Sequence, residues 1–264
     1  MRIAVIGNSH LAAFKLAWDD LADNYQDVRL VFFGSAGEEM RSKVAIEDDC
    51  LVAVTEEARN DFYFTSGGLT KIDFSDFDAV LLIGMGCRML PLYSALKSHR
   101  VYDAPSSSLP SRKKASYRTI SAACIAQICV DQMKNTSLFQ VLSLIRSVSN
   151  IPAFIIPCPF PSEACAYDDQ ARWAFLKRIA SKTVQQSYYE GLACLCRSFA
   201  ATLITQPDTT ITGLLFTKEE LSVGSVRFDD HLLTTLHKET DYVHMNRDYG
   251  KEVLTFILQG IGQR

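Results

Sequence analysis

Short apolar runs alternate along the chain with longer segments in which apolar residues recur at helical spacing. Residues Arg2–Ile6 form an apolar, partly β-branched run directly before a glycine, which is typical of a buried strand. From Leu11 to Leu21 the apolar positions instead follow the periodicity of an amphipathic helix. By the same criteria we expect further strands over residues 27–34, 79–83, 151–161 and 201–207. Further helices are expected over residues 115–133, 168–199 and 246–258, and a second helix follows 115–133 and ends at about residue 148.

The strand over Ala79–Ile83 is apolar at every position, as expected where helices cover both faces of a sheet. Strand–helix alternation of this kind predicts an α/β fold with a mainly parallel sheet of about five strands between two helical layers. Residues 43–65 contain short β-like pieces separated by acidic turns, which predicts a small β-rich insertion around 43–70. No linker-like stretch divides the 264 residues, so we expect a single domain over 1–264.

The composition is that of a globular protein with a sizeable core, since 48% of the residues are hydrophobic and 22% are charged. The formal net charge of −3 gives no general attraction to nucleic acid or to an acidic membrane surface. The first apolar run is too short for a signal peptide, and no run of eighteen apolar residues predicts a membrane span. Several of the eight cysteines stand in apolar stretches and none forms a C-x-x-C pair, so we expect reduced thiols and a cytoplasmic location.

Two short motifs near the ends of the chain carry candidate chemistry. Ser9 stands between the first strand and the first helix, at the carboxyl edge of the expected sheet, where ligands of open α/β sheets bind. Asp241 and His244 lie three residues apart just before the last helix, so one turn of chain brings a carboxylate next to an imidazole. A carboxylate in that position fixes the ring tautomer and stabilises the imidazolium, while Ser9 supplies a nucleophile. These residues predict a catalytic triad.

Each of the three residues also has a plain structural interpretation. Ser9 is suited to capping the helix that follows it. Asp241 can cap a turn, and His244 can be an ordinary surface histidine. The catalytic interpretation is favoured by their joint placement, with the serine after the first strand and Asp-x-x-His before the last helix.

Both motifs resemble those of the SGNH (GDSL-type) hydrolase family. The family's first block, Gly-Asp-Ser, is matched by Gly7-Asn8-Ser9, and its last block, Asp-x-x-His, is matched by Asp241-Tyr-Val-His244. The resemblance implies a flavodoxin-like three-layer α/β/α fold, with the nucleophilic serine after the first strand and the acid and base before the last helix. We expect no cofactor.

The middle blocks of the family match less fully. In "FFGSAGEE" the oxyanion glycine corresponds best to Gly37, with Gly34 as the alternative. In "LIGMGCR" Gly84 matches the next block, but Gly86 stands where the family has an asparagine. That oxyanion donor is therefore absent, or is replaced by the backbone amide of Gly86 or the side chain of Arg88. Losing one such donor costs about 10²–10³ in rate.

The neighbours of Ser9 are expected to line the oxyanion and substrate site: Asn8, which replaces the aspartate of the first block, and His10. One segment of acidic residues and histidines superficially resembles a metal site: Asp229, Asp230, His231 and His237. The spacing does not place its histidines on one helical face, so solvated loop residues are the better interpretation and no metal is expected. Cys87, beside the proposed site, is interpreted as a buried thiol.

Together these features predict a serine ester hydrolase acting on a small O-acyl ester, such as an acetylated carbohydrate. Two alternatives remain open. One is a binding protein of the same fold, with weak or lost chemistry, that recognises a glycan or a protein. The other is an O-acyltransferase, in which an alcohol takes the acyl group in place of water. An NAD-binding enzyme is disfavoured, because Ser9 and Ala12 stand where Gly-x-Gly-x-x-Gly needs glycines.

Overall fold

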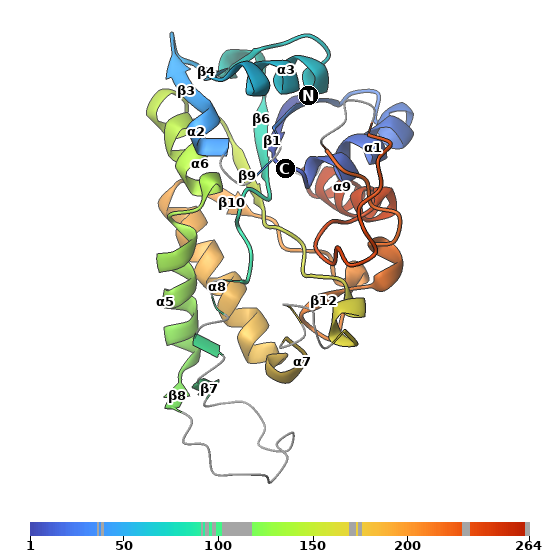
Figure 1. The fold of residues 1–264 in the computed structure, drawn as a ribbon. Coiled ribbons are helices and arrows are strands. Elements are labelled where there is room, and N and C mark those ends of the chain that lie inside the picture. Colours follow the sequence, from blue (N-terminus) through green and yellow to red (C-terminus); the bar gives the residue numbers. More distant parts are fainter. Residues whose placement is uncertain are drawn as a thin grey trace.

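The computed structural model describes residues 1–35, 37, 40–90, 92, 95–96, 99–101, 118–168, 173, 176–228 and 233–261. At its centre lies a five-stranded parallel sheet in the order β10-β9-β6-β1-β2 (Figure 1). Each strand falls within or extends one apolar run of the sequence. The predicted α/β fold is therefore confirmed. The strands are β1 (Arg2–Gly7), β2 (Arg29–Gly34), β6 (Ala79–Ile83), β9 (Ala153–Ile156) and β10 (Ala201–Leu203).

The five parallel strands, numbered along the chain, stand in the order 2-1-3-4-5. This is the winding of flavodoxin-like folds. The chain first moves from β1 outward to β2 and then crosses back to β6 on the other side of β1. The connections that leave β1 and β6 therefore diverge at the carboxyl edge of the sheet, which is the place where such sheets bind their ligands.

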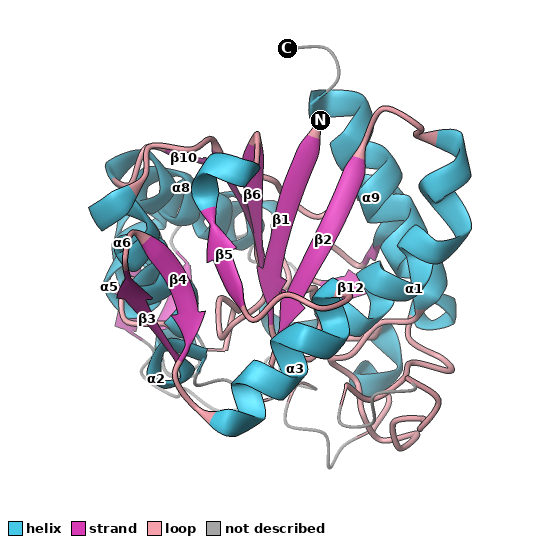
Figure 2. Cartoon of the chain, turned by 90° about the horizontal axis from the view of Figure 1, so that it is seen from above, coloured by secondary structure: helices cyan, strands magenta, loops and turns pink. Residues whose placement is uncertain are grey.

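Helices cover both faces of the sheet, as Figure 2 shows. On one face α1 (Leu11–Leu21) packs side by side with α9 (Arg247–Ile261). On the other lie α6 (Ser137–Val148) and α8 (Lys182–Ser198), with α5 (Ala122–Met133) packed against α8. Side chains of a strand alternate between faces, so β1 places Ile3 and Val5 in one core and Ala4 and Ile6 in the other.

The expected insertion is present, but only part of it is β-structure. Three short strands form an antiparallel sheet: β3 (Val44–Glu47), β4 (Cys50–Ala53) and β5 (Lys71–Asp73). Between β4 and β5 lies a helix, α3 (Glu56–Ser66), which packs against β2, and the prediction of β-like pieces up to residue 65 is wrong here. Thr55 caps this helix and Gly67 ends it in the left-handed conformation, with φ 77°. End signals, rather than apolar periodicity, mark α3.

Two of the predicted helices are shorter than expected. The segment 168–199 holds α7 (Leu176–Ile179) and α8, which are separated where Ser181 caps α8. The helix expected from residue 115 starts at Ala122, after the short strand β8 (Arg118–Ile120). Residues 115–117 lie outside the described residues. The remaining short elements are α2 (Met40–Lys43), β7 (His99–Val101), β11 (Ile211–Thr212), β12 (Phe216–Thr217) and 3-10 turns at 22–24, 74–76, 163–166, 208–210 and 219–221.

None of the helices in the described ranges is long and apolar enough to cross a membrane. All eight cysteines are described, and none of them forms a disulfide. Burial raises the pKa of the thiols of Cys87, Cys129, Cys165 and Cys196. These side chains therefore stay protonated at neutral pH and pack as small apolar residues.

Candidate active site

The turn after β1 presents Ser9 at the carboxyl edge of the sheet. Gly7, the last residue of β1, pairs with Ile83 of β6, and a Cβ at Gly7 would lie 2.7 Å from the Ile83 carbonyl oxygen. The close approach of the two strands therefore requires glycine here. α1 begins at Leu11 with His10 as its N-cap residue, and no side-chain hydrogen bond caps it. Ser9 is thus not used as a helix cap.

A tight turn before α9 holds Asp241 and His244. The Asp241 amide donates to the Lys238 carbonyl over 2.9 Å. Asp241 Oδ1 accepts from the amides of Val243 (3.0 Å) and His244 (3.1 Å), the usual way in which aspartate closes a turn. Asp241 therefore has the structural role of a turn residue through Oδ1, and its Oδ2 stays available to a histidine.

Asn246 fastens this segment to the body of the protein. Its Oδ1 accepts from the amides of Asp248 (3.0 Å) and Tyr249 (3.2 Å), which caps α9. Its Nδ2 donates to the carbonyl oxygens of Glu220 (2.7 Å) and Val223 (2.8 Å). One side chain thus ties the start of the last helix to a neighbouring turn, and this anchor also places the residues that directly precede the helix.

The structure brings the three predicted triad residues into one hydrogen-bonded chain. Ser9 Oγ lies 2.9 Å from His244 Nε2, although 235 positions separate the two residues in sequence. His244 Nδ1 lies 2.8 Å from Asp241 Oδ2. Both distances are those of direct hydrogen bonds. The side chains of Asp241 and His244 are 21% and 18% exposed, so this hydrogen-bonded group of three residues is partly buried and still in contact with solvent.

The surroundings of Asp241 keep its carboxyl ionised. Burial disfavours the charge, but hydrogen bonds from His237 and His244, the charge of His244 and the Val243 amide outweigh that penalty. The pKa of Asp241 is consequently held well below its usual value of 3.8. An ionised Asp241 accepts a hydrogen bond from the Nδ1–H of His244, which keeps the proton on Nδ1 and leaves the Nε2 lone pair facing Ser9. This is the tautomer that a general base for Ser9 needs.

His10 lies against His244, with ring centroids 5.0 Å apart and an angle of 28° between the rings. Removal from water, followed by the charge of His244, lowers the pKa of His10 from 6.5 to about 3, and Arg88 adds a smaller effect of the same sign. A ring with this pKa is a poor proton acceptor at neutral pH. His10 therefore lies beside the triad without the properties of a second base.

Asn8 joins the turn after β1 to the loop after β6. It is 3% exposed, and its Oδ1 accepts from the amides of Met85 (3.3 Å) and His10 (3.5 Å). Gly84 and Gly86 have φ values of 72° and 81°, which favour glycine. A Cβ at Gly84 would also come within 2.7 Å of Asn8 Oδ1. The structure thus places Asn8 beneath the site, where it holds two loops together.

Three backbone amides at the carboxyl edge are candidates for an oxyanion hole, namely those of Ser9, Gly37 and Gly86. Within the described ranges, none of the three donates a hydrogen bond to another protein group. Gly37 is exposed with φ 90°, while Gly86 and Arg88 are partly exposed in the loop after β6. That these amides point into one pocket with Ser9 stays a prediction.

The loop that carries Gly37 is fastened at its base. The Gly34 amide donates to Thr65 Oγ1 of α3 over 3.1 Å, so Gly34, the alternative oxyanion glycine, has no amide to offer. Ser35, which is fully buried, donates its hydroxyl to Asp61 of α3 over 2.7 Å. The helix that the sequence analysis missed therefore anchors this loop, and Gly37 remains the better match.

His237 belongs to the site, and its interpretation as a solvated loop residue is wrong. Its Nδ1 lies 2.9 Å from Asp241 Oδ2, and its ring stacks on that of His244 with centroids 4.0 Å apart and an angle of 7°. The His237 amide donates to the Ser225 carbonyl over 2.9 Å, beside an isolated β-bridge. Helical spacing between histidines was the wrong criterion for an extended segment. The available signal was the spacing of four residues between His237 and Asp241.

His237, Asp241 and His244 also form a group whose potential metal-ligand atoms all lie within 4.8 Å of one another. A zinc ion binds in the plane of an imidazole, about 2.0–2.1 Å from the nitrogen. Since the two rings here are stacked and nearly parallel, a metal bound to both Nδ1 atoms would lie outside both ring planes. The arrangement suits hydrogen bonding to a shared carboxylate better than metal binding. The other residues of the suspected metal segment, Asp229, Asp230 and His231, lie outside the described residues.

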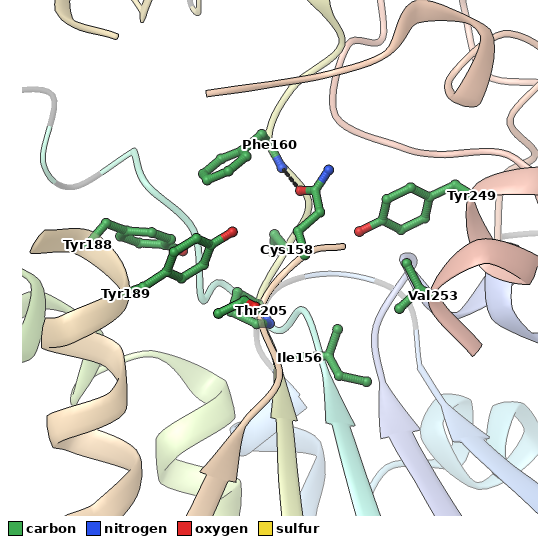
Figure 3. A pocket seen from close by; sticks show the side chains of 10 residues that line it. Ile156, Cys158, Phe160, Tyr188, Tyr189, Thr205, Tyr249 and Val253 are labelled. Carbon is green, nitrogen blue, oxygen red and sulfur yellow. Dashed lines mark hydrogen bonds between the residues drawn. The ribbon is translucent and has the colours of Figure 1, made fainter. Parts of the chain in front are cut away.

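Two hollows in the surface lie away from the triad. A cavity of about 10 Å³ is shown in Figure 3, with Tyr189 and Tyr249 on opposite sides of it, and it has room for about one water molecule. An open groove of about 440 Å³ runs between Pro207–Thr209 and α9. Neither hollow is lined by a triad residue. The first is too small for a substrate, and neither is part of the candidate active site.

Comparison of the chain with protein-family models, with curated protein sequences and with solved structures finds no match in any of the three. The class of site is therefore defined by fold and geometry alone. It is a Ser-His-Asp constellation at the point where the connections of a flavodoxin-like sheet diverge.

Proposed function

We propose that the chain is a serine ester hydrolase that acts on a small O-acyl ester. The observation that carries this proposal is the continuous hydrogen-bonded chain from Ser9 Oγ through His244 to Asp241 Oδ2. A free serine hydroxyl is a weak nucleophile at neutral pH, and direct contact with a correctly oriented imidazole is what activates it. The same three side chains would need no such alignment if they only capped a helix and a turn.

In the proposed reaction, Ser9 Oγ attacks the ester carbonyl carbon while His244 Nε2 takes the hydroxyl proton. Asp241 stabilises the imidazolium that forms. Collapse of the tetrahedral intermediate breaks the bond to the alcohol, which leaves with the proton from His244, and an acyl-Ser9 ester remains. Water then attacks this ester, again through His244, and releases the carboxylic acid and free Ser9.

We choose hydrolysis over transfer because the partly exposed triad is in contact with water, the acceptor that hydrolysis needs. The choice of a small O-acyl ester, such as an acetate on a carbohydrate, follows from the resemblance to SGNH hydrolases. The amides of Ser9, Gly37 and Gly86 are the proposed oxyanion donors. Gly86 takes the place of the family's asparagine, so its backbone amide would replace a side-chain amide.

The test is covalent labelling of the full chain by a fluorophosphonate, together with hydrolysis of p-nitrophenyl acetate. We expect wild-type protein to be labelled at Ser9, and Ser9→Ala and His244→Ala to lose labelling and at least about 10³-fold in kcat/KM. Ser147→Ala is the matched control, since Ser147 Oγ donates to the Leu144 carbonyl on the surface of α6, and it should retain both activities.

An unlabelled wild-type protein, or a Ser9→Ala variant that hydrolyses the ester at the wild-type rate, contradicts the proposal. The first result favours the alternative of a binding protein, to which the missing family asparagine at Gly86 already points. Isothermal titration with acetylated and deacetylated oligosaccharides would then measure that alternative directly.

A further inference from the structure

His237 contacts the same carboxylate oxygen as the candidate general base. Its Nδ1 lies 2.9 Å from Asp241 Oδ2, and the Nδ1 of His244 lies 2.8 Å from that oxygen. The side chain of His237 is 12% exposed, and its ring is nearly parallel to that of His244. One oxygen of Asp241 thus serves two stacked imidazoles.

The rest of the His237 ring shows which tautomer this contact uses. Its Nε2 is buried and has no hydrogen-bond partner within the described part of the chain. A proton on Nε2 would therefore be buried without an acceptor, at a cost, whereas a proton on Nδ1 points at a carboxylate oxygen. The geometry favours the tautomer with its proton on Nδ1, so His237 acts as a hydrogen-bond donor to Asp241.

We propose that His237 is a positioning residue for the triad, an inference that rests on the proposed hydrolase function. It has two effects through neighbouring groups. Its Nδ1–H donates a hydrogen bond to Asp241 Oδ2 and so partly neutralises the negative charge on that oxygen. Asp241 then stabilises protonated His244 less strongly. Its ring, stacked on His244, holds the plane of that imidazole so that Nε2 keeps facing Ser9.

The first effect has a defined sign. His244 must be unprotonated to act as a base, so kcat/KM falls on the acid side as His244 gains a proton. Removing the His237 donor leaves Asp241 Oδ2 entirely to His244 and favours that protonation. The acid limb of the pH–rate profile then moves to higher pH. The other ring in contact with His244, that of His10 at the start of α1, stays unchanged, as does Arg88 in the loop after β6, whose charge acts on His10.

Two substitutions separate the donor from the ring. His237→Phe keeps an aromatic ring against His244 and places carbon where the unpartnered Nε2 lies, but it removes the donor. His237→Asn keeps an N–H near the position of Nδ1 and removes the stacked ring. The Phe variant buries no additional polar group, and the Asn variant keeps a donor near the position of Nδ1. We therefore expect both variants to fold, and urea unfolding will check this.

The experiment records the pH dependence of kcat/KM with p-nitrophenyl acetate for the wild type and both variants. We expect the acid limb of His237→Phe to move upward by about half to one pH unit, a threefold to tenfold change in proton affinity for one hydrogen bond. His237→Asn should keep the wild-type acid limb and lose severalfold in kcat. An unmoved limb in the Phe variant, or an equal upward shift in the Asn variant, overturns the inference.

A second readout is independent of turnover. NMR of the histidine Cε1–H groups follows the His244 ring in each protein without substrate, with His244→Ala used to assign its signal. The midpoint of the His244 titration should move upward in His237→Phe alone. This measurement decides the role of His237 even for a wild-type protein that neither reacts with a fluorophosphonate nor cleaves an ester, a result that would contradict only the proposed function.

Discussion

Asp241 divides its two carboxylate oxygens between the backbone and the histidines. Oδ1 accepts from two amides of its own turn, while Oδ2 faces the Nδ1 atoms of His237 and His244. The side chain that orients the candidate base is thereby held in place by the turn that carries the base. At the level of single residues, this carboxylate connects the turn, the candidate base and His237.

Substituting Asp241 by asparagine tests how much the charge of this carboxylate contributes to the stability of the fold. The pKa of Asp241 is lowered in the folded protein, so its ionised form stabilises the fold above about pH 3.8, and this contribution is lost as the pH falls further. We expect Asp241→Asn to be less stable than the wild type at pH 7, with a difference that shrinks below pH 4. Urea unfolding across this range measures it.

The matched control for that series is Asp131→Asn. Asp131 is about half exposed on α5 and pairs with Lys134, and such surface pairs contribute little to stability. Its substitution should leave the pH dependence of unfolding unchanged. If the difference in unfolding free energy between the wild type and Asp241→Asn stayed constant down to pH 3, the charge of the carboxylate would have no part in the effect.

Helices α1 and α9 connect the two halves of the site at the scale of elements. α1 follows Ser9, and α9 follows the turn that carries His244, so their packing sets the distance between the two candidate catalytic motifs. The helices meet at Gly250, where an added Cβ would collide with the backbone of Ala13 and lie 2.9 Å from the Cβ of Ala17. Only glycine permits this approach.

Gly250→Ala should therefore destabilise the protein by about 1–3 kcal/mol, the usual range for overpacking a close contact. It should also lower the proposed esterase activity more than its stability loss explains, because α9 is displaced from α1. Gly260→Ala is the control in the same helix, since nothing lies within 4 Å of its added Cβ. That variant should match or slightly exceed the wild type in urea unfolding. Equal effects of both substitutions would contradict the assignment of Gly250 as the helix contact.

At the scale of the whole molecule, two apolar cores share one sheet. Each central strand contributes alternate residues to both cores, as β1 does with Ile3 and Val5 on one face and Ala4 and Ile6 on the other. Loss of the sheet would expose both cores at once. We therefore expect the two cores to unfold in one cooperative transition.

The two tryptophans of the chain report on the two cores separately. Trp18 packs against the core of α1 and α9, and Trp173 belongs to the core on the opposite face. The variants Trp18→Phe and Trp173→Phe leave one fluorophore in each case. In each variant, the urea transition followed by tryptophan fluorescence should coincide with the transition followed by far-UV circular dichroism. A fluorescence transition well separated from the dichroism signal would show that the cores behave as independent units.

Elements with local signals can be predicted from the amino-acid sequence without any tertiary information. An apolar run such as Ala79–Ile83 cannot be exposed at any position, so it predicts a central strand without knowledge of its neighbours. Ser9 was identifiable because it follows the first strand, and Asp241 and His244 because they precede the last helix. A residue that directly follows a strand keeps its place at the carboxyl edge of the sheet under any order of parallel strands.

The way in which these elements meet is visible only in the folded protein. Strand–helix alternation is compatible with several windings, and the observed order 2-1-3-4-5 places β1 beside β6, which brings the turn after β1 beside the loop after β6. α3 was missed because its apolar face is short, and His237 was missed because its partner is a carboxylate in a non-helical segment. Contacts such as these depend on distances across the fold rather than on periodicity along the chain, which is why spacing in the sequence does not reveal them.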